Sequence, residues 1–124
     1  MNWRWSHFGM LALVIFAPGC GPDLQALCER QESCLGGNDA DITACLTVYE
    51  GARDNAQDIG CGDEYDTYIE CLTPKYECVG VGTCTTDDEC NGSACIEDEC
   101  KTFQLDATQA DTCEAEANAY SRCD

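Results

Sequence analysis

The stretch CGDEYDTYIEC at residues 61–71 shares its residue pattern with CEAEANAYSRC at residues 113–123, near the end of the chain. Both read Cys-x2-Glu-x3-Tyr-x2-Cys, and on a helix the four shared positions fall within roughly 80° of arc. We therefore expect two helices whose cysteines and tyrosine face the same neighbour. Packed antiparallel, they could be joined at both ends, by Cys61–Cys123 and Cys71–Cys113. The alternative is chance spacing in a cysteine-rich chain.

This arrangement resembles the twin Cys-x9-Cys helical hairpin of CHCH proteins, although 41 residues separate the two halves here. A second unit lies between them, CTTDDECNGSACIEDEC at residues 84–100. It predicts a turn at Asn91-Gly92 and a hairpin of residues 94–96 and 100–103 around Glu97-Asp98. The unit resembles the short four-cysteine loops of EGF-like and dickkopf-type modules. That resemblance implies the pairs Cys84–Cys95 and Cys90–Cys100.

Helical periodicity and turn residues predict the remaining elements. A first helix is expected over 23–35, ended by Gly36-Gly37-Asn38. A second runs from an N-cap at Asp41 to about residue 58, with an apolar face of Cys45, Val48, Tyr49, Ala52, Ala56 and Ile59. A third covers 63–72 and stops before Pro74. Residues 75–84 read as a loop, and Asp106 with Gln109 offers a capping box for a final helix to residue 123.

The first 19 residues differ in kind from the rest. They contain a weakly cationic start, an unbroken apolar run from Met10 to Ala17, and then small residues. That order is typical of an export signal, and its alternative is a misplaced start. As a helix the run would span about 12 Å, against roughly 30 Å of hydrocarbon, so it is too short for a permanent membrane span.

An odd number of cysteines, 13, needs an explanation in an exported chain. Cys20 directly follows the signal, after Ala17-Pro18-Gly19, and this resembles the lipobox of bacterial prolipoproteins. The resemblance implies that Cys20 carries a lipid and begins the mature chain. Lipidation leaves an even set of twelve cysteines for disulfides: Cys28, Cys34, Cys45, Cys61, Cys71, Cys78, Cys84, Cys90, Cys95, Cys100, Cys113 and Cys123. Ala17-x-Gly19 also fits ordinary secretory cleavage, which stays as the alternative.

The mature chain is acidic and poor in large apolar residues. Beyond residue 19 lie all 24 acidic residues and five basic ones, for a net charge of −19. Leu, Ile, Val and Phe make up 14 of 105 residues, a fraction that is typical of disordered chains. We therefore expect disulfides to supply what the apolar core lacks. The charge argues against nucleic acid as a partner.

Metal, redox and catalytic chemistry find little support. No Cys-x2-Cys pair occurs, and the only histidine, His7, lies in the signal, which argues against zinc and thioredoxin-type sites. No cofactor is expected. Glu64 and Glu116 are the best acid–base candidates, but a carboxylate near a helix N-terminus also stabilises the helix dipole. Carboxylates crowd residues 87–99, where Asp87, Asp88, Glu97 and Asp98 are weak calcium candidates against the commoner reading of solvated surface.

These observations predict a small, mostly α, disulfide-rich domain of about four short helices with a hairpin-like four-cysteine insert. Residues 1–19 form the signal, 20–22 a lipidated tether and 23–124 the domain, with the insert at about 79–103. We expect a non-enzymatic envelope lipoprotein, at the outer membrane or cell surface, held to the membrane by its lipid and acting as a structural or binding module for an unknown extracellular or periplasmic partner. The alternatives are a secreted protein, an enzyme inhibitor or small enzyme on a disulfide frame, and a calcium-dependent adhesion module.

The chain as a whole resembles the cysteine-rich lipoproteins of myxobacterial-type genomes. The signal, Cys20 and the element Gly-Cys-x2-Glu-x3-Tyr-x2-Cys at residues 60–71 carry this resemblance. It implies an address and an architecture, and no reaction.

Overall fold

The computed structural model describes residues 21–123. Four helices and three strands follow one another as α1 (Leu24–Leu35), α2 (Asp39–Asp58), α3 (Gly62–Leu72), β1 (Tyr76–Thr83), β2 (Ala94–Ile96), β3 (Glu99–Leu105) and α4 (Glu114–Ser121). Short 3-10 turns at Thr73–Lys75, Asp87–Cys90 and Ala110–Cys113 join them. The expected class, a mostly helical disulfide-rich domain with a small hairpin unit, is confirmed. The predicted signal and Cys20 lie outside the described residues.

The first helix begins and ends where its sequence predicts. The Asp23 carboxylate accepts a hydrogen bond from the Ala26 N–H at 2.9 Å, which satisfies one of the unpaired donors of the first turn. At the other end Gly36 takes a left-handed conformation, φ 71°, and its N–H bonds to the carbonyl of Glu32. Leu24, Leu27 and Cys28 are buried along one stripe of this helix.

The second helix corrects two expectations. Its N-cap is Asn38, and Asp41 instead completes a capping box by accepting from the Asn38 N–H at 2.9 Å. The apolar face predicted for it is wrong at Ala52, Val48 and Ile59, which are exposed, the last two by 70% and 57%. The helix turns inward through Cys45, Leu46, Tyr49 and Ala56. Cys45 sets this orientation because its disulfide fixes α2 against α1.

The final helix is shorter than expected. The Asp106 carboxylate accepts from the Thr108 N–H at 2.9 Å and from the Gln109 amide at 3.0 Å, so it closes a local turn and does not cap a helix. A 3-10 turn follows, and α4 begins at Glu114 with no side-chain cap. The predicted capping box at Asp106 and Gln109 is therefore wrong. The 3-10 turn sets Cys113 at the start of α4, opposite the C-terminal end of α3.

Residues 76–83 form a strand where the sequence predicted a loop. Strand β1 pairs antiparallel with β3, from Tyr76 opposite Leu105 to Gly80 opposite Lys101, with a bulge before Thr83. Strand β2 pairs with the other edge of β3, and Glu97 and Asp98 form the hairpin turn with φ of 53° and 62°. The sheet order is β1-β3-β2. The glycines in Val79-Gly80-Val81-Gly82 have weak strand propensity, so this strand depends on its partner.

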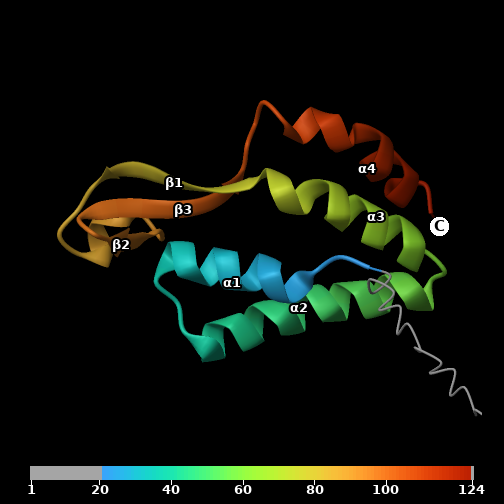
Figure 1. Ribbon diagram of the computed structural model, residues 1–124, viewed down its shortest axis with the longest axis horizontal. Coiled ribbons are helices and arrows are strands. Elements are labelled where there is room, and N and C mark those ends of the chain that lie inside the picture. The colour runs from blue at the N-terminus through green and yellow to red at the C-terminus, as the bar shows by residue number, and fades with distance from the viewer. Residues whose placement is uncertain (1–20, 124) are drawn as a thin grey trace, which may run out of the picture.

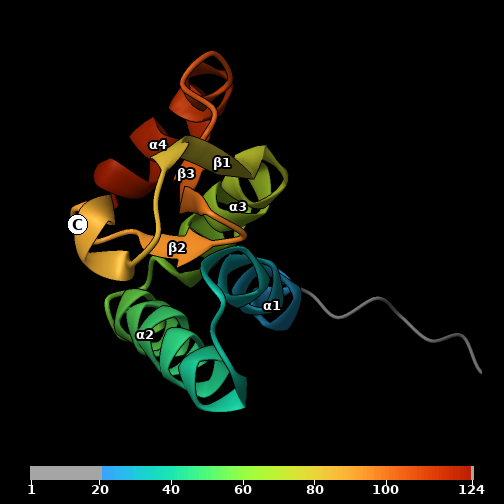
Figure 2. The same cartoon turned by 90° about the vertical axis from the view of Figure 1, so that its left-hand side faces the viewer.

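The helices gather toward one end of the molecule and the sheet lies toward the other (Figure 1). Each helix packs on the next in chain order, and α1 also packs on β3. The view along the long axis shows α1 between α2 and the sheet (Figure 2). The larger core cluster joins Leu24, Ala56, Cys61, Tyr65 and Ile69. Within residues 21–123 no helix is long and apolar enough to cross a membrane.

Sulfur makes up much of the interior. Among the described residues, eight of the fourteen buried apolar residues are cysteines, and the second core cluster consists of Cys84, Cys90 and Cys100 with Cys95 packed against it. Six disulfides join Cys28–Cys45, Cys34–Cys78, Cys61–Cys123, Cys71–Cys113, Cys84–Cys95 and Cys90–Cys100. Four of these pairs are those expected from the repeat and from the four-cysteine resemblance. The other two attach α1 to α2 and to β1.

Candidate functional site

The two matched helices, α3 and α4, pack side by side and are closed at both ends by disulfides. The Cα atoms of Cys61 and Cys123 lie 5.7 Å apart, and those of Cys71 and Cys113 lie 5.9 Å apart. Between the bridges the Tyr120 ring meets Tyr65 edge-on at 5.7 Å and stacks on Tyr68 at 6.2 Å. The repeated tyrosine therefore fills the seam between the helices, where aromatic pairs contribute about 1 kcal/mol beyond their burial.

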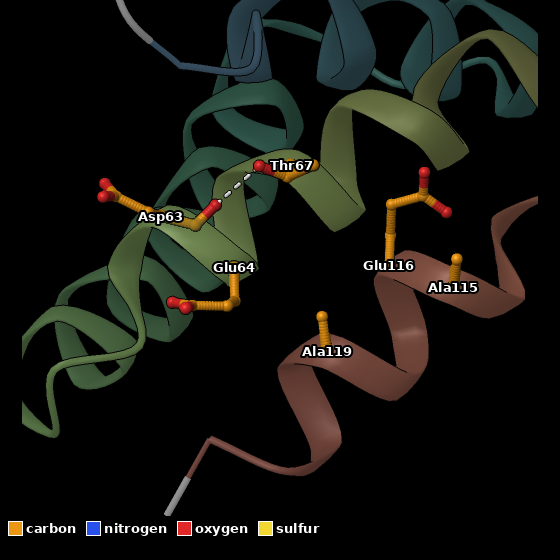
Figure 3. A pocket seen from close by; sticks show the side chains of 6 residues that line it. All are labelled: Asp63, Glu64, Thr67, Ala115, Glu116 and Ala119. Atoms are coloured by element: carbon orange, nitrogen blue, oxygen red, sulfur yellow. Dashed lines mark hydrogen bonds between the residues drawn. The ribbon is translucent and has the colours of Figure 1, made fainter.

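A groove of about 330 Å³ runs beside this seam. Its walls are Asp63, Glu64, Thr67, Ala115, Glu116 and Ala119. Glu64 and Glu116 were the acid–base candidates of the sequence, and Figure 3 shows their side chains pointing in different directions. Thr67 hydrogen-bonds the carbonyl of Asp63 at 2.8 Å, so its hydroxyl is engaged within its own helix. The two glutamates thus line the same groove, but their carboxylates are not directed at one point as those of an acid and a base acting together would be.

One carboxylate oxygen at this groove is in an unfavourable environment. Glu116 Oε2 is buried and has no hydrogen-bond partner, the only such side-chain atom among the described residues. A buried acceptor without a partner costs about 1–3 kcal/mol. The alanines at 115 and 119 leave the groove open above this helix (Figure 3). The unpaired Oε2 of Glu116 therefore lowers the stability of the fold.

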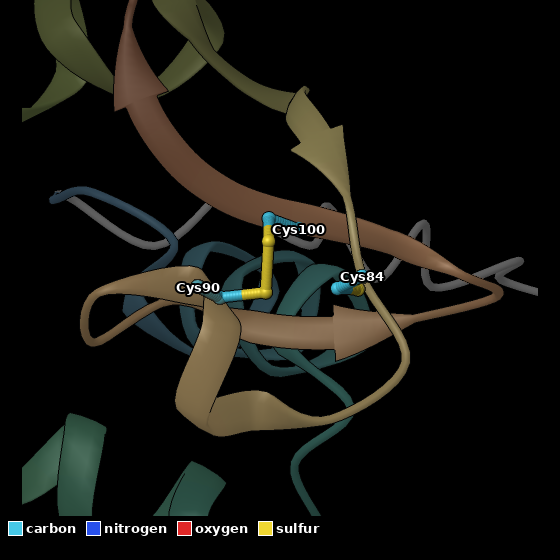
Figure 4. A group of neighbouring side chains, drawn as sticks. All are labelled: Cys84, Cys90 and Cys100. Atoms are coloured by element: carbon cyan, nitrogen blue, oxygen red, sulfur yellow. A yellow bond between two sulfur atoms is a disulfide. The ribbon is translucent and has the colours of Figure 1, made fainter.

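The four-cysteine unit gathers three sulfur atoms, from Cys84, Cys90 and Cys100, within 4.8 Å of one another (Figure 4). In residues 21–123 no other set of three or more histidine, cysteine or carboxylate ligand atoms lies so close. All three sulfurs belong to disulfides, Cys90 with Cys100 and Cys84 with Cys95. Thiolates are the form that binds metals, so this cluster is a covalent core.

The calcium candidates occupy separate positions in the same unit. Asp87 Oδ1 accepts a hydrogen bond from the Cys95 N–H at 2.7 Å, and Asp88 lies beside it on an exposed turn. Glu97 and Asp98 form the exposed β2–β3 turn, and the Asp98 carbonyl accepts from the Cys84 N–H at 3.0 Å. Calcium needs six to eight oxygen ligands at one point. The structure does not gather the four carboxylates into such a group.

The basic residues are used inside the molecule. Arg30 donates to the carbonyls of Thr73 at 3.0 Å and Tyr76 at 2.6 Å, and its guanidinium lies 5.8 Å from the Phe103 ring centre. Arg53 forms a two-pronged ion pair with Asp66, with N–O distances of 2.7 and 2.5 Å, and the pKa of Arg53 is raised mainly by that hydrogen bond.

The two lysines of the domain are engaged in the same way. Lys75 donates to the Cys71 carbonyl at 2.9 Å, and Lys101 pairs with Glu99. The fifth basic residue of the described part, Arg122, is exposed next to Cys123 and its disulfide with Cys61. Only Asp66 and Glu99 among the acids of the described part form ion pairs with a basic residue. The remaining carboxylates give the surface a negative charge with little local compensation.

Some hydrogen-bonded carboxylates are held in their charged form. The Thr85 N–H and hydroxyl both donate to Glu89, at 2.7 and 3.0 Å, and these bonds lower the pKa of Glu89 below its usual value. The Thr108 hydroxyl and N–H, with the Gln109 amide, lower the pKa of Asp106 in the same way. Burial raises the pKa of Tyr49, Tyr65 and Tyr76. Glu89 and Asp106 are therefore held in their charged form at neutral pH.

Arg30 had no predicted role, although its position in the sequence carried a signal. Arg30 lies three residues after Leu27 and four before Cys34, both buried, so helical spacing directs it toward the same neighbour. There it links α1 to the Tyr76 end of β1 and covers Phe103, which stacks on Tyr76 at 5.2 Å.

No protein-family model, curated protein or solved structure matches the chain.

Proposed function

We propose that this chain is a non-catalytic lipoprotein of the bacterial cell envelope whose rigid, acidic surface binds a positively charged partner outside the cytoplasm. The observation that supports this proposal is that most of its basic side chains are bonded to groups of the same domain. Four of the five basic side chains of the mature chain bond to carbonyls or carboxylates of the same domain, while within residues 21–123 the acids outside the two ion pairs form no ion pair with a described basic residue. Such a surface attracts cations over its whole extent.

The size of the charge makes this attraction strong and salt-dependent. With 24 carboxylates and five cations, the mature chain carries −19. Exposed charges interact over a Debye length of about 8 Å at physiological ionic strength and about 30 Å at 0.01 M. A cationic partner should therefore associate rapidly at low salt and lose affinity as salt rises. Nucleic acid and bare anionic membrane are repelled by the same field.

The disulfides fix the shape on which these charges are displayed. Every helix and every strand of the described domain carries or adjoins a bridged cysteine, so the surface cannot collapse or spread when like charges repel. The N-terminal end of α1 lies on the side away from the sheet (Figure 1). If the chain is anchored at Cys20, the four-cysteine unit projects away from the membrane, which suits a surface that meets a partner.

The test measures binding of fluorescently labelled poly-L-lysine to the mature protein, purified from an exporting host, as sodium chloride is raised. We expect saturable binding at low salt and a log-linear loss of affinity with salt, while poly-L-glutamate does not bind. Absence of poly-L-lysine binding at low salt would reject the proposal. Intact mass tests the anchor separately, because a diacylglyceryl modification should appear on the wild type and not on Cys20→Ser. An unmodified, soluble wild type would favour the secreted alternative.

A further inference from the structure

Strand β1 lies at the edge of the sheet, with β3 on one side and no described element paired to the other. In Figure 1 it forms the outer rim of the sheet, and α1 reaches it through the Cys34–Cys78 disulfide and through Arg30. Edge strands of this kind are templates for pairing with another chain, and proteins usually block them with lysine, proline or a very short strand. Strand β1 has eight residues and contains neither lysine nor proline.

Hydrogen bonds at the start of the strand show which backbone groups face outward. The Lys75 carbonyl accepts from the Asp106 N–H at 3.0 Å, so this pair exchanges hydrogen bonds and the pairing alternates from there along β1. Tyr76, Cys78 and Gly80 therefore direct their N–H and C=O groups away from β3. The Tyr76 carbonyl confirms this phase, because Arg30 reaches it from α1 at 2.6 Å.

This leaves a short recognition edge, which we define as the outer side of Cys78–Gly80. Its two outward residues, Cys78 and Gly80, offer two N–H and two C=O groups, and no hydrogen bond from another described element reaches them. Both residues are exposed. The edge is bounded by Arg30 on the Tyr76 carbonyl at one end and by the bulge after Gly80 at the other. It therefore fits one extended segment in one register.

An unpaired carboxylate flanks the recognition edge. Glu77 is exposed on β1 itself and forms no ion pair with a basic residue of the described part. Glu99 of β3 also lies against Gly80, but its carboxylate pairs with Lys101, so its charge is compensated. An incoming strand with basic side chains matches Glu77 and the acidic surface around it, whereas a second copy of this chain, at −19, would be repelled.

We infer that the recognition edge binds an extended lysine- or arginine-rich segment of a partner protein as an added β-strand. Four main-chain hydrogen bonds to Cys78 and Gly80 would fix the segment, and Glu77 would favour basic side chains on it. This inference rests on the proposed function. It adds where the basic segment of the partner binds and that the segment binds in an extended conformation.

The test measures the affinity of the mature protein for three short synthetic peptides at moderate salt, with poly-L-lysine as the reference ligand. The first alternates lysine with valine, the second is the same peptide with every backbone amide N-methylated, and the third replaces lysine by glutamate. We expect the first to bind at least about tenfold more tightly than either of the others, because N-methylation removes pairing without changing charge. Amide hydrogen exchange at Cys78 and Gly80 should slow when the first peptide binds.

A pair of charge-reversed variants locates the site. Glu77→Lys lies beside the recognition edge, and Glu50→Lys makes the same change on the exposed surface of α2. Both variants change the net charge by the same amount, but only Glu77 lies beside the recognition edge. Glu77→Lys should therefore lower the affinity for the alternating peptide about tenfold more than Glu50→Lys does. Equal effects of the two variants, or equal binding of the methylated peptide, would overturn strand addition while leaving cation binding intact. A concentration-dependent dimer that Glu77→Lys dissociates would overturn the choice of occupant, because the edge would then pair with a second copy.

Discussion

Removal of the Cys61–Cys123 disulfide gives a quantitative test of how the helix pair is held. The two cysteines are 62 residues apart in sequence, but Cys71–Cys113 already joins the other ends of the same helices. Cutting the outer bridge therefore opens a loop of only about 20 residues, the two helical segments themselves. Chain entropy assigns about 3 kcal/mol to a loop of that length. We expect Cys61→Ala with Cys123→Ala to lower the free energy of unfolding by that amount.

The assay is urea unfolding followed by far-ultraviolet circular dichroism, with the near-ultraviolet tyrosine signal recorded in parallel. Loss of the bridge should loosen α4 and weaken the tyrosine signal that arises where Tyr65 meets Tyr120. The matched control removes Cys84–Cys95, a bridge of sequence separation 11 in the other core cluster, and should leave that signal unchanged. A loss below about 1 kcal/mol, with an intact tyrosine signal, would refute the account of the helix pair.

Three further perturbations follow from single contacts. Arg53→Met should lower the free energy of unfolding by about 1 kcal/mol, because it removes a two-pronged, partly buried ion pair with Asp66. A double-mutant cycle with Asp66→Asn should show that the two residues are coupled, and additive effects would contradict this. Glu116→Met should stabilise the protein by about 1 kcal/mol in urea melts, since it removes a buried oxygen without a partner, and a destabilised variant would contradict this. The pKa of Glu89 is lower in the folded state because Thr85 donates to it, so its contribution is present above the ordinary value of 4.5 and is lost as pH falls below it. Glu89→Gln should therefore flatten the acid side of the stability profile, and an unchanged profile would remove this role.

The sequence was most informative where cysteine spacing coincided with helical period. In both matched stretches the spacing of ten residues places two cysteines and a tyrosine on one face, so the partner of each cysteine follows once the helices are paired. The pairs of the four-cysteine unit were expected for a different reason, its resemblance to the short loops of EGF-like and dickkopf-type modules, and the structure has both of them.

The sequence was least informative where contacts are distant along the chain. Cys28–Cys45 and Cys34–Cys78 join elements whose relative placement depends on the whole fold, so spacing alone does not select them. Strand β1 was missed because its glycines read as a loop, and only the alignment with β3 makes it a strand. That omission also hid the recognition edge, which exists only when the sheet is assembled.

The exposed face of α2 shows a related limit. Val48 and Ile59 are apolar and were assigned inward, yet both face solvent, while the polar side chain of Arg53 turns toward Asp66 of α3. A disulfide at Cys45 and an ion pair together determine the rotation of this helix. In a domain where most buried apolar residues are cysteines, hydrophobicity alone does not predict which face of a helix points inward.

Thiol counting before and after reduction tests most directly the claim that covalent bridges hold this acidic chain folded. The native mature protein, denatured under non-reducing conditions, should show no free thiol among residues 21–123, and its helical circular dichroism should collapse when a reductant is added without denaturant. Twelve reactive thiols in native material that retains its helical spectrum would contradict the account.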